Sequence, residues 1–313
     1  MNIKKPNFWD RKIGFLSIIL LPFSLIFFIV NQIKKKIIKG KKFNIPIICI
    51  GNIYVGGTGK TPASIFLGKE LKKLGHKPVI LRKYYKNHLD EYNLIKNHFK
   101  DLILSINRID GIEKLKNLSF DTIILDDGFQ DHSIKKDINI ICFNQNQLIG
   151  NGMIIPSGPL REGLNSLKKA NIILINGKKN SEFENKILKI NSELEIFYSA
   201  YKPINLNEFK KKKLLAVAGI GNPENFFQLI EENELRIEKK IVFPDHFQIS
   251  KNQFQNIIKE AKYKNYEIIM TEKDYFKIRK YKFKNVNYLK VMLKIFEQER
   301  FIKKINEIYN ENY

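Results

Sequence analysis

The residues best suited to chemistry lie in one glycine-rich stretch, GNIYVGGTGKTP at residues 51–62. An apolar run predicts a strand over residues 45–50 before it, and a helical pattern follows over residues 61–74 and stops at Gly75. Glycines in such a strand-to-helix turn let backbone N–H groups surround phosphate oxygens. In this pattern a lysine contacts the β and γ phosphates and the next hydroxyl binds Mg²⁺. The predicted phosphate and nucleotide-binding residues are Gly56, Gly57, Thr58, Gly59, Lys60 and Thr61.

The match to a phosphate loop has one departure. A strict GxxxxGK[ST] pattern would place glycine where this sequence has Tyr54. A tight strand-to-helix connection without a ligand is the simpler alternative, but it does not explain Lys60 and Thr61 at the required offsets. The stretch therefore predicts a variant phosphate loop.

A second acidic motif follows another apolar run, in TIILDDGFQ at residues 122–130. The run predicts a strand over residues 122–126 that ends in Asp126 and Asp127, the arrangement that holds Mg²⁺ directly or through water in P-loop enzymes. Strands often end in Asp-Gly turns, so the motif alone is weak. Together with the phosphate loop it predicts a metal and nucleotide site.

Short apolar runs alternate with amphipathic stretches from residue 43 onward. This alternation predicts an α/β fold, a P-loop NTPase-like and mostly parallel sheet with flanking helices. Further strands are expected over residues 78–82, 138–143 and 171–175, and a second strand-and-helix set begins at Leu214. The expected division is an N-terminal anchor with basic flanks over 1–42, a kinase domain over 43–205 and a smaller C-terminal α/β domain over 206–313.

The first 42 residues combine an apolar run with basic flanks. Ten of them are Lys or Arg and only Asp10 is acidic, and residues 13–33 carry no charge over 21 positions. A helix of that length would span roughly 30 Å, the thickness of the hydrocarbon layer. We therefore expect a membrane-anchor helix, with Pro22 either kinking it or making it monotopic. The larger basic cluster follows the run, which predicts that the bulk of the chain lies in the cytoplasm.

Overall composition narrows the class of protein. The net charge of +23 favours an anionic partner such as a nucleotide, an acidic lipid or a nucleic acid. Cys49 and Cys142 lie in apolar runs and indicate neither a disulfide framework nor a zinc site. A nucleic-acid binder would leave the apolar N-terminal run unexplained and has no matching motif here, so no nucleic acid is expected.

Several further motifs make the chain resemble the tetraacyldisaccharide 4'-kinases, the lipid A 4'-kinase family. They are GNxxxGGTGKTP, DDGFQ, the stretch from GNG at residue 150 to GPLRE at residue 162, AGIGNP at 218–223, FPDH at 243–246 and TEKD at 271–274. The resemblance implies ATP-dependent, Mg²⁺-dependent phosphorylation of a tetraacyldisaccharide 1-phosphate. It further implies the cytoplasmic face of a Gram-negative inner membrane, whose anionic lipid would be a partner.

The resemblance also assigns residue roles. It places Asp126, Asp127, Gln130 and Glu162 with Thr61 at the metal, and Arg161 beside the phosphates. The family's catalytic base falls on Asp90 and its assisting histidine on His246, with Lys60 completing the catalytic set. Around Asp90 only Asp-Glu of the family's GDEP motif is retained, and the upstream SRGYG motif is reduced to LRKYY, which keeps Arg82 and Tyr84.

An alternative from another class uses the same motifs. A membrane-tethered P-loop ATPase that acts as a nucleotide switch would carry the same loop and acidic strand end. ATP consumption that depends on a lipid acceptor separates a kinase from such a switch.

Overall fold

The computed structural model describes residues 5–86, 88–116, 118–245 and 247–312. Its internal contacts divide the chain into two compact units. The large unit comprises Lys5–Tyr84, Asp101–Ala200 and Leu293–Tyr313, and the small unit comprises Tyr85–Lys100 and Tyr201–Met292. The chain passes from the large unit to the small unit after Ala200 and returns after Met292, and the earlier segment Tyr85–Lys100 also belongs to the small unit.

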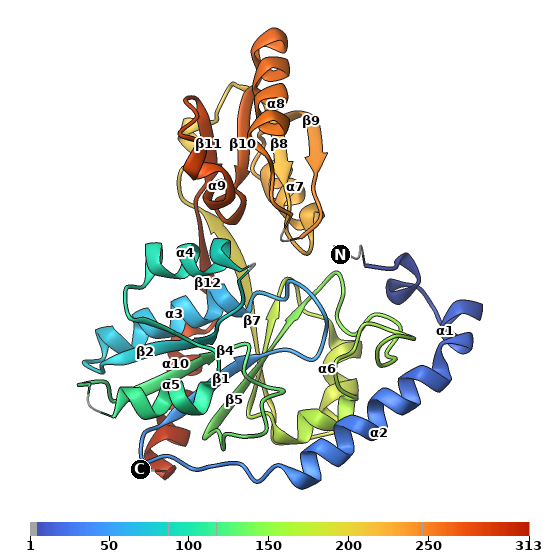
Figure 1. Ribbon diagram of the computed structural model, residues 1–313, viewed down its shortest axis with the longest axis vertical. Coiled ribbons are helices and arrows are strands. Elements are labelled where there is room, and N and C mark those ends of the chain that lie inside the picture. Colours follow the sequence, from blue (N-terminus) through green and yellow to red (C-terminus); the bar gives the residue numbers. More distant parts are fainter. Residues whose placement is uncertain (1–4, 87, 117, 246, 313) are drawn as a thin grey trace. The chain divides into compact units, whose positions relative to one another are not determined.

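The large unit is built on an eight-stranded sheet with the order β12-β7-β6-β5-β1-β4-β2-β3 (Figure 1). Neighbouring strands from β7 to β3 pair in parallel. The strands are β1 (Ile47–Gly51), β2 (Pro78–Lys83), β3 (Leu102–Ser105), β4 (Thr122–Asp126), β5 (Ile138–Asn144), β6 (Ile172–Asn176), β7 (Glu195–Pro203) and β12 (Val291–Ile295). Both faces of such a sheet are covered, which explains the continuous apolar runs of β1 and β4. The expectation of an α/β fold with a mostly parallel sheet is confirmed.

Helices of the large unit connect and cover these strands. They are η1 (Asn7–Asp10), α1 (Phe15–Ile19), α2 (Leu21–Ile37), α3 (Lys60–Lys73), α5 (Arg108–Leu115), η2 (Leu164–Lys169), α6 (Ser181–Leu188) and α10 (Gln298–Asn312). Helix α3 packs on β1, β2 and β4, and α5 packs on β2 and β3. The strand that precedes the glycine-rich stretch and the strand that ends in Asp126 are therefore direct neighbours under one helix.

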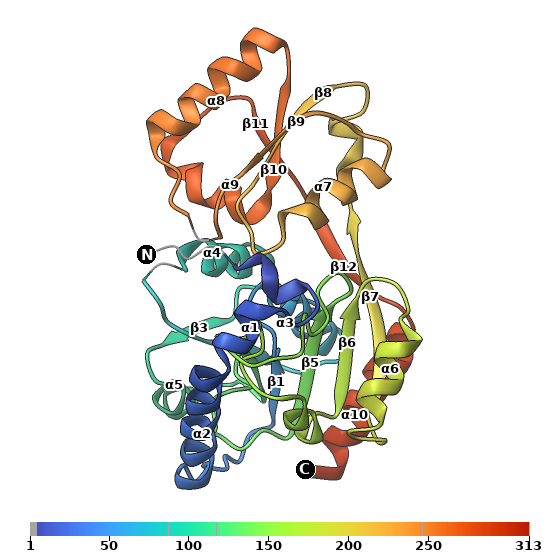
Figure 2. The ribbon, with the colours of Figure 1, turned by 90° about the vertical axis from the view of Figure 1, so that its right-hand side faces the viewer.

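The small unit has its own parallel sheet, with the order β11-β10-β8-β9 (Figure 2). Its elements are α4 (Leu89–His98), η3 (Leu206–Glu208), β8 (Lys213–Ala218), α7 (Pro223–Glu232), β9 (Arg236–Val242), α8 (Lys251–Lys264), β10 (Glu267–Thr271), α9 (Glu272–Ile278), η4 (Arg279–Tyr281) and β11 (Val286–Leu289). Alternate residues of β8 enter two different apolar clusters, Leu214 and Ala216 on one face and Leu215 and Val217 on the other. Helix α4, which the chain reaches directly after β2, packs on α9 within this unit.

The apolar N-terminal run forms two helices rather than one. Helix α1 ends at Ile19 and α2 begins at Leu21, with Pro22 in its first turn. A proline has no N–H to donate to the carbonyl four residues earlier, so a continuous helix would lose a hydrogen bond here, whereas the first turn of a new helix does not need it. Among the described residues, no helix combines the length and apolar character needed to cross a bilayer. The membrane anchor expected over residues 13–33 is thus not one continuous helix, because the chain breaks between α1 and α2 next to Pro22.

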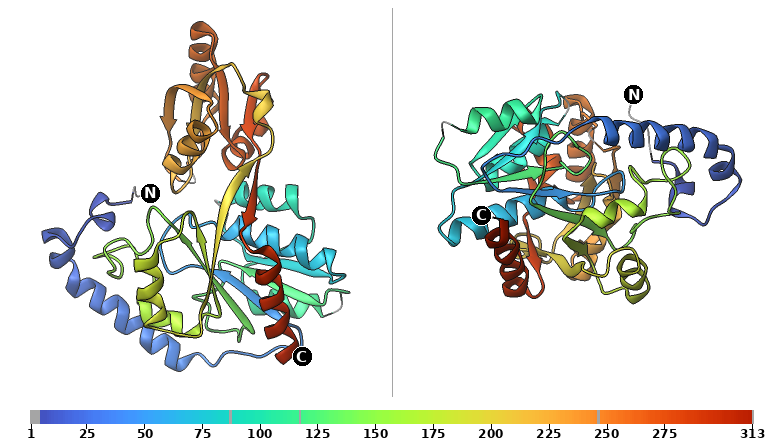
Figure 3. Two further views of the ribbon diagram at one scale, coloured as in Figure 1. Left: turned by 180° about the vertical axis from the view of Figure 1, so that it is seen from behind. Right: turned by 90° about the horizontal axis from the view of Figure 1, so that it is seen from below.

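These two helices are apolar outside and polar inside. Helix α2 runs along the outside of the large unit (Figure 3). Its buried residue is Ser24, and that of α1 is Ser17. Exposed side chains include Phe15 at 77% and Phe23 at 60% of their full accessibility. This burial pattern is the inverse of an ordinary surface helix.

Candidate functional site

The strand order brings the predicted phosphate and metal residues together at one edge of the large sheet. Ile50 of β1 pairs in register with Asp126 of β4, and Arg82 of β2 pairs with Asp126 from the other side. Parallel strands present their carboxyl ends at the same edge, where open α/β sheets bind ligands. Helix α3 begins at this edge with Lys60 and Thr61.

The Thr61 hydroxyl and the Asp126 carboxylate form the centre of the site. Thr61 Oγ1 donates to Asp126 Oδ2 at 3.1 Å, and Ser64 Oγ donates to Asp126 Oδ1 at 3.1 Å. Arg82 forms an ion pair with Asp126 and donates to Thr61 Oγ1 at 3.0 Å. Asp126 is fully buried, so this hydroxyl and guanidinium shell keeps its charge compensated.

The glycine-rich loop, residues 52–59, has an open face. Gly56 has φ of 118°, and a Cβ added there would meet no heavy atom within 4 Å. Gly59, at φ of 92°, precedes α3 and gives no side-chain cap to its first N–H groups. The first N–H groups of α3 therefore have no side-chain cap, and uncapped N–H groups at a helix start suit phosphate oxygens.

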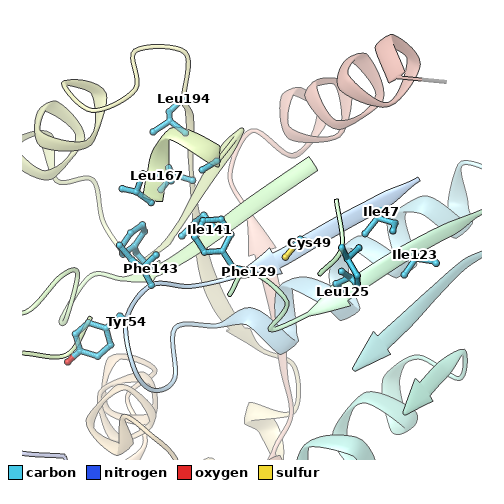
Figure 4. Packing of buried hydrophobic residues seen from close by; sticks show 14 of the residues in the cluster. Ile47, Cys49, Tyr54, Ile123, Leu125, Phe129, Ile141, Phe143, Leu167 and Leu194 are labelled. Carbon is cyan, nitrogen blue, oxygen red and sulfur yellow. The ribbon is translucent and has the colours of Figure 1, made fainter. Parts of the chain in front are cut away.

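A buried asparagine shapes this loop. Asn52 Nδ2 donates to the carbonyl oxygen of Tyr54 at 2.5 Å and to the hydroxyl of Thr58 at 3.0 Å. Tyr54 is itself fully buried and belongs to the apolar core of the large unit (Figure 4). Its hydroxyl donates to Asp10 in η1. The residue that departs from the strict loop pattern therefore fills the core instead of the open face of the loop.

The GPLRE stretch runs alongside the glycine-rich loop. Val55 N donates to Pro159 O at 2.9 Å, and Arg161 N donates to Ile53 O at 2.7 Å. This pairing brings Arg161 to Asp127, where Nη1 donates to Oδ1 at 2.9 Å. Arg161 also donates to Gln130 Oε1 at 3.3 Å. The structure thus brings Arg161 to Asp127 and Gln130, from which the sequence separates it by 34 and 31 positions.

Positive charge dominates the surroundings of Asp127. Lys60 Nζ lies 3.7 Å from Asp127 Oδ1. Burial acts to raise the pKa of Asp127, but the charges of Lys60, Arg161 and Arg82 outweigh burial and hold that pKa well below its usual range. The cationic groups that now pair with the Asp127 carboxylate are of the type that binds anionic ligands such as phosphates.

Glu162 has different partners from the other predicted metal residues. Lys35 Nζ of α2 lies 2.7 Å from its Oε2, and His132 Nε2 lies 3.4 Å from its Oε1. Burial acts to raise the pKa of Glu162, and the hydrogen bonds from His132 and Lys35 lower it below its usual range. Glu162 therefore connects the N-terminal helices to the end of the GPLRE stretch.

The predicted base belongs to the small unit. Asp90 belongs to α4 in the small unit and is buried, with 3% of its surface exposed. Oδ2 of Asp90 is 3.8 Å from the ammonium groups of both Lys273 and Lys277. His246 lies outside the described residues.

Sequence reasoning assigned no role to Arg82, Asn52 or Arg108. Arg108 Nη2 donates to Asp127 O at 2.7 Å and so supports the acidic turn. A signal for Arg82 was present, because it ends one predicted strand as Asp126 ends another. The chain order of strands does not give their order in the sheet, so that signal could not be used.

Comparisons with known proteins agree on one family. Residues 16–310 match the family model described as LpxK, tetraacyldisaccharide-1-P 4'-kinase. The tetraacyldisaccharide 4'-kinase of Pelagibacter ubique (strain HTCC1062) is 38% identical and covers 100% of both chains. That of Wigglesworthia glossinidia brevipalpis is 34% identical over 96% of this chain and 85% of its own.

A solved structure agrees at the level of the fold. LpxK from Aquifex aeolicus, solved in complex with ATP, superposes with a TM-score of 0.71 at 24% identity, over 94% of this chain and 99% of that one. The chain has this strand order, the glycine-rich loop and the acidic strand end. Its relative from Pelagibacter ubique aligns with it over the full length of both chains. This chain belongs to the tetraacyldisaccharide-1-P 4'-kinase family, LpxK.

Proposed function

We propose that this chain is an ATP-dependent lipid kinase that acts in lipid A biosynthesis. It transfers the γ-phosphate of ATP to the 4'-hydroxyl of a tetraacyldisaccharide 1-phosphate. A new bond forms between the hydroxyl oxygen and the γ-phosphorus, the bond from that phosphorus to the bridging oxygen breaks, and ADP leaves. The observation that carries the proposal is the cluster of Lys60, Thr61, Asp126, Asp127 and Arg161 in a chain of this family.

The nucleotide phosphates would bind along the open face of the glycine-rich loop. The N–H groups at the start of α3 and the Lys60 ammonium would hold the β and γ phosphates. Arg161 would release Asp127 and turn to the phosphate, because a bidentate guanidinium contact to either anion is similar in strength. Phosphoryl transfer depends mainly on such positioning and charge compensation.

The residues present fit Mg²⁺. The Thr61 hydroxyl and the Asp126 carboxylate are adjacent oxygen donors, the type that Mg²⁺ prefers, and Mg²⁺ usually keeps several waters as its other ligands. Asp127, Gln130 and Glu162 complete the proposed set. When bound, the ion would neutralise the charge on the transferring phosphate.

Asp90 would accept the proton of the sugar hydroxyl, with His246 assisting it. A sugar hydroxyl is a poor nucleophile at neutral pH, and a general base typically contributes about 10²–10⁴-fold to such a step. The role requires the carboxylate to be ionised and within hydrogen-bond reach of the hydroxyl during the reaction.

The N-terminal helices would place the enzyme on the membrane. We propose that α1 and α2 lie in the inner membrane surface, on the cytoplasmic face of a Gram-negative cell. The exposed apolar side chains of α1 and α2 would enter the acyl region, and Lys34 and Lys36 would contact anionic headgroups. Ser24 supports this orientation, since it holds the polar side of α2 on the protein through Ile154 O and the Ser157 hydroxyl, both at 2.8 Å.

One assay tests the proposal. Purified protein in detergent micelles receives γ-labelled ATP with or without a disaccharide 1-phosphate lipid. We expect label on the lipid, ADP formation that depends on the lipid, and loss of at least about 10²-fold in Lys60→Met. Lys168→Met removes the same charge from an exposed position and should behave as wild type. ADP formation without labelled lipid would instead support the nucleotide switch.

A further inference from the structure

The AGIGNP and TEKD motifs meet in a buried network of the small unit. Asp274 of TEKD, in the first turn of α9, accepts from Gly219 N at 2.7 Å and from the Thr271 hydroxyl at 2.6 Å. Lys277, one turn further along α9, donates to Asp274 Oδ1 at 2.6 Å and to Gly219 O at 2.7 Å. Asp274 and Lys277 each have 1% or less of their side chains exposed.

Gly219 leaves no room for another residue in this network. A Cβ there would lie 3.0 Å from Asp274 Oδ1 and 3.1 Å from Phe243 Cβ. The backbone of the AGIG turn therefore approaches α9 closely enough to bond both charged side chains. The two motifs fix the position of the Lys277 ammonium with two hydrogen-bond acceptors, Gly219 O and Asp274 Oδ1, neither of which belongs to Asp90.

A second lysine of α9 is fixed independently. Lys273 Nζ lies 3.0 Å from both Glu91 Oε1 and Asp245 Oδ1. Burial acts to lower the pKa of Lys273, but Glu91, Asp245 and Asp90 outweigh it and raise that pKa, so the side chain stays charged. Helix α4 is also held to α9 at its far end, where Asn97 and His98 bond Glu272 at 2.8 and 2.7 Å.

Both lysines converge on one atom. The two ammonium groups each lie 3.8 Å from Asp90 Oδ2, and the other charged groups of this cluster are Glu91, Asp245 and Asp274. A carboxyl group as buried as Asp90 tends to keep its proton, and a protonated carboxyl cannot act as a base. Two fixed positive charges at this distance favour the ionised form, whereas the carboxylates of Glu91, Asp245 and Asp274 act in the opposite direction.

We propose that Lys273 and Lys277 are positioning residues that keep Asp90 ionised and oriented. The TEKD and AGIG motifs would then support the proton acceptor by holding Lys277 in place. This inference rests on the proposed function, in which Asp90 is the base. It gives one physical purpose to two motifs that the phosphate site leaves without a role.

The test compares single charge removals in the full-length protein. We expect Lys277→Met and Lys273→Met each to lower kcat about tenfold or more, with the KM for ATP unchanged. The acid limb of the pH profile of kcat/KM should move to higher pH by about one unit, since each change removes one positive charge from Asp90. Lys273→Arg keeps the charge and should restore most of kcat. Lys259→Met, an exposed lysine of α8, is the matched control and should match wild type.

A double variant shows whether the lysines act through Asp90. If they do, Asp90→Asn combined with Lys273→Met loses no more activity than Asp90→Asn alone. Full additivity, or a folded Lys273→Met enzyme with unchanged kcat and pH profile, would overturn the inference while leaving the kinase intact. Lys273 is chosen over Lys277 because its side chain is 13% exposed, against 1% for Lys277. Absence of lipid labelling by wild type would overturn the proposed function itself, and this inference with it.

Discussion

Asp127 and Asp274 both follow a parallel strand and both pair with a lysine, but their surroundings differ. Asp127 keeps 27% of its side chain exposed, and its partners Lys60 and Arg161 are 11% and 28% exposed. Asp274 is completely buried, and its partner Lys277 has 1% exposed. The ion pairs of Asp127 with Lys60 and Arg161 are accessible to solvent. The ion pair of Asp274 with Lys277 is buried, and both side chains bond the backbone of Gly219. The same residue types therefore form accessible ion pairs in one unit and a closed, buried pair in the other.

The largest expected effect is the loss of stability when the buried Asp274–Lys277 ion pair is removed. Asp274→Ala leaves the Lys277 ammonium and the Gly219 N–H without the carboxylate that they bond, and should lower the free energy of unfolding by about 3–5 kcal/mol. Asp127→Ala should cost about 1 kcal/mol or less, because its partners reach solvent. Urea denaturation of both variants measures the difference. Equal losses would contradict the distinction between the two regions.

Removing Arg161 from its accessible ion pair with Asp127 is expected to reduce activity more than stability. Arg161→Met should lower kcat/KM for ATP by about 10–10²-fold, because a charge contact to the transferring phosphate is lost. Its unfolding free energy should stay within about 1 kcal/mol of wild type. Arg300→Met, an exposed arginine of α10, serves as the control in the same lipid-labelling assay. A stability loss without a kinetic one would assign Arg161 to the structure rather than to the nucleotide.

The exposed apolar side chains of α1 and α2 are expected to contribute to membrane binding. Phe23→Gln should weaken binding to vesicles of anionic phospholipid about fivefold, because roughly half the transfer free energy of a Phe side chain is lost. Tyr263→Gln removes an aromatic ring that is 86% exposed on the small unit and should leave vesicle binding unchanged. Co-sedimentation with vesicles measures both. Equal binding by wild type and Phe23→Gln would remove α2 from the membrane contact.

The smallest expected effect is a pH dependence. The folded-state pKa of Asp127 is depressed, so its contribution to stability is present above its ordinary pKa of 3.8 and disappears as the pH falls below that value. The difference in Tm between wild type and Asp127→Asn should therefore be a few degrees at pH 6 and narrow toward pH 3. A difference that is constant with pH would show that Asp127 is not held by its cations.

Much of the geometry around the glycine-rich loop could be predicted because it is local in sequence. The strand, the glycine-rich turn, Lys60 and Thr61 form one continuous stretch, and Asp126 and Asp127 end a strand with a clear apolar pattern. The N-terminal helices were only partly predictable. Composition gave their apolar surface and Pro22 indicated the break, whereas the inward position of Ser24 depends on its contact with Ile154 and Ser157.

Apolar periodicity and glycine positions predicted strands β1, β2, β4, β5 and β6 and helix α3, since these signals depend on near neighbours in the chain. The pairing of Arg82 with Asp126, the burial of Tyr54 in the core and the place of the Asp90 segment in the small unit are visible only in the folded chain. Sheet order and the choice of unit arise from contacts between residues separated by tens to hundreds of positions. Such contacts are selected by packing of the whole chain, and no spacing within one motif encodes them.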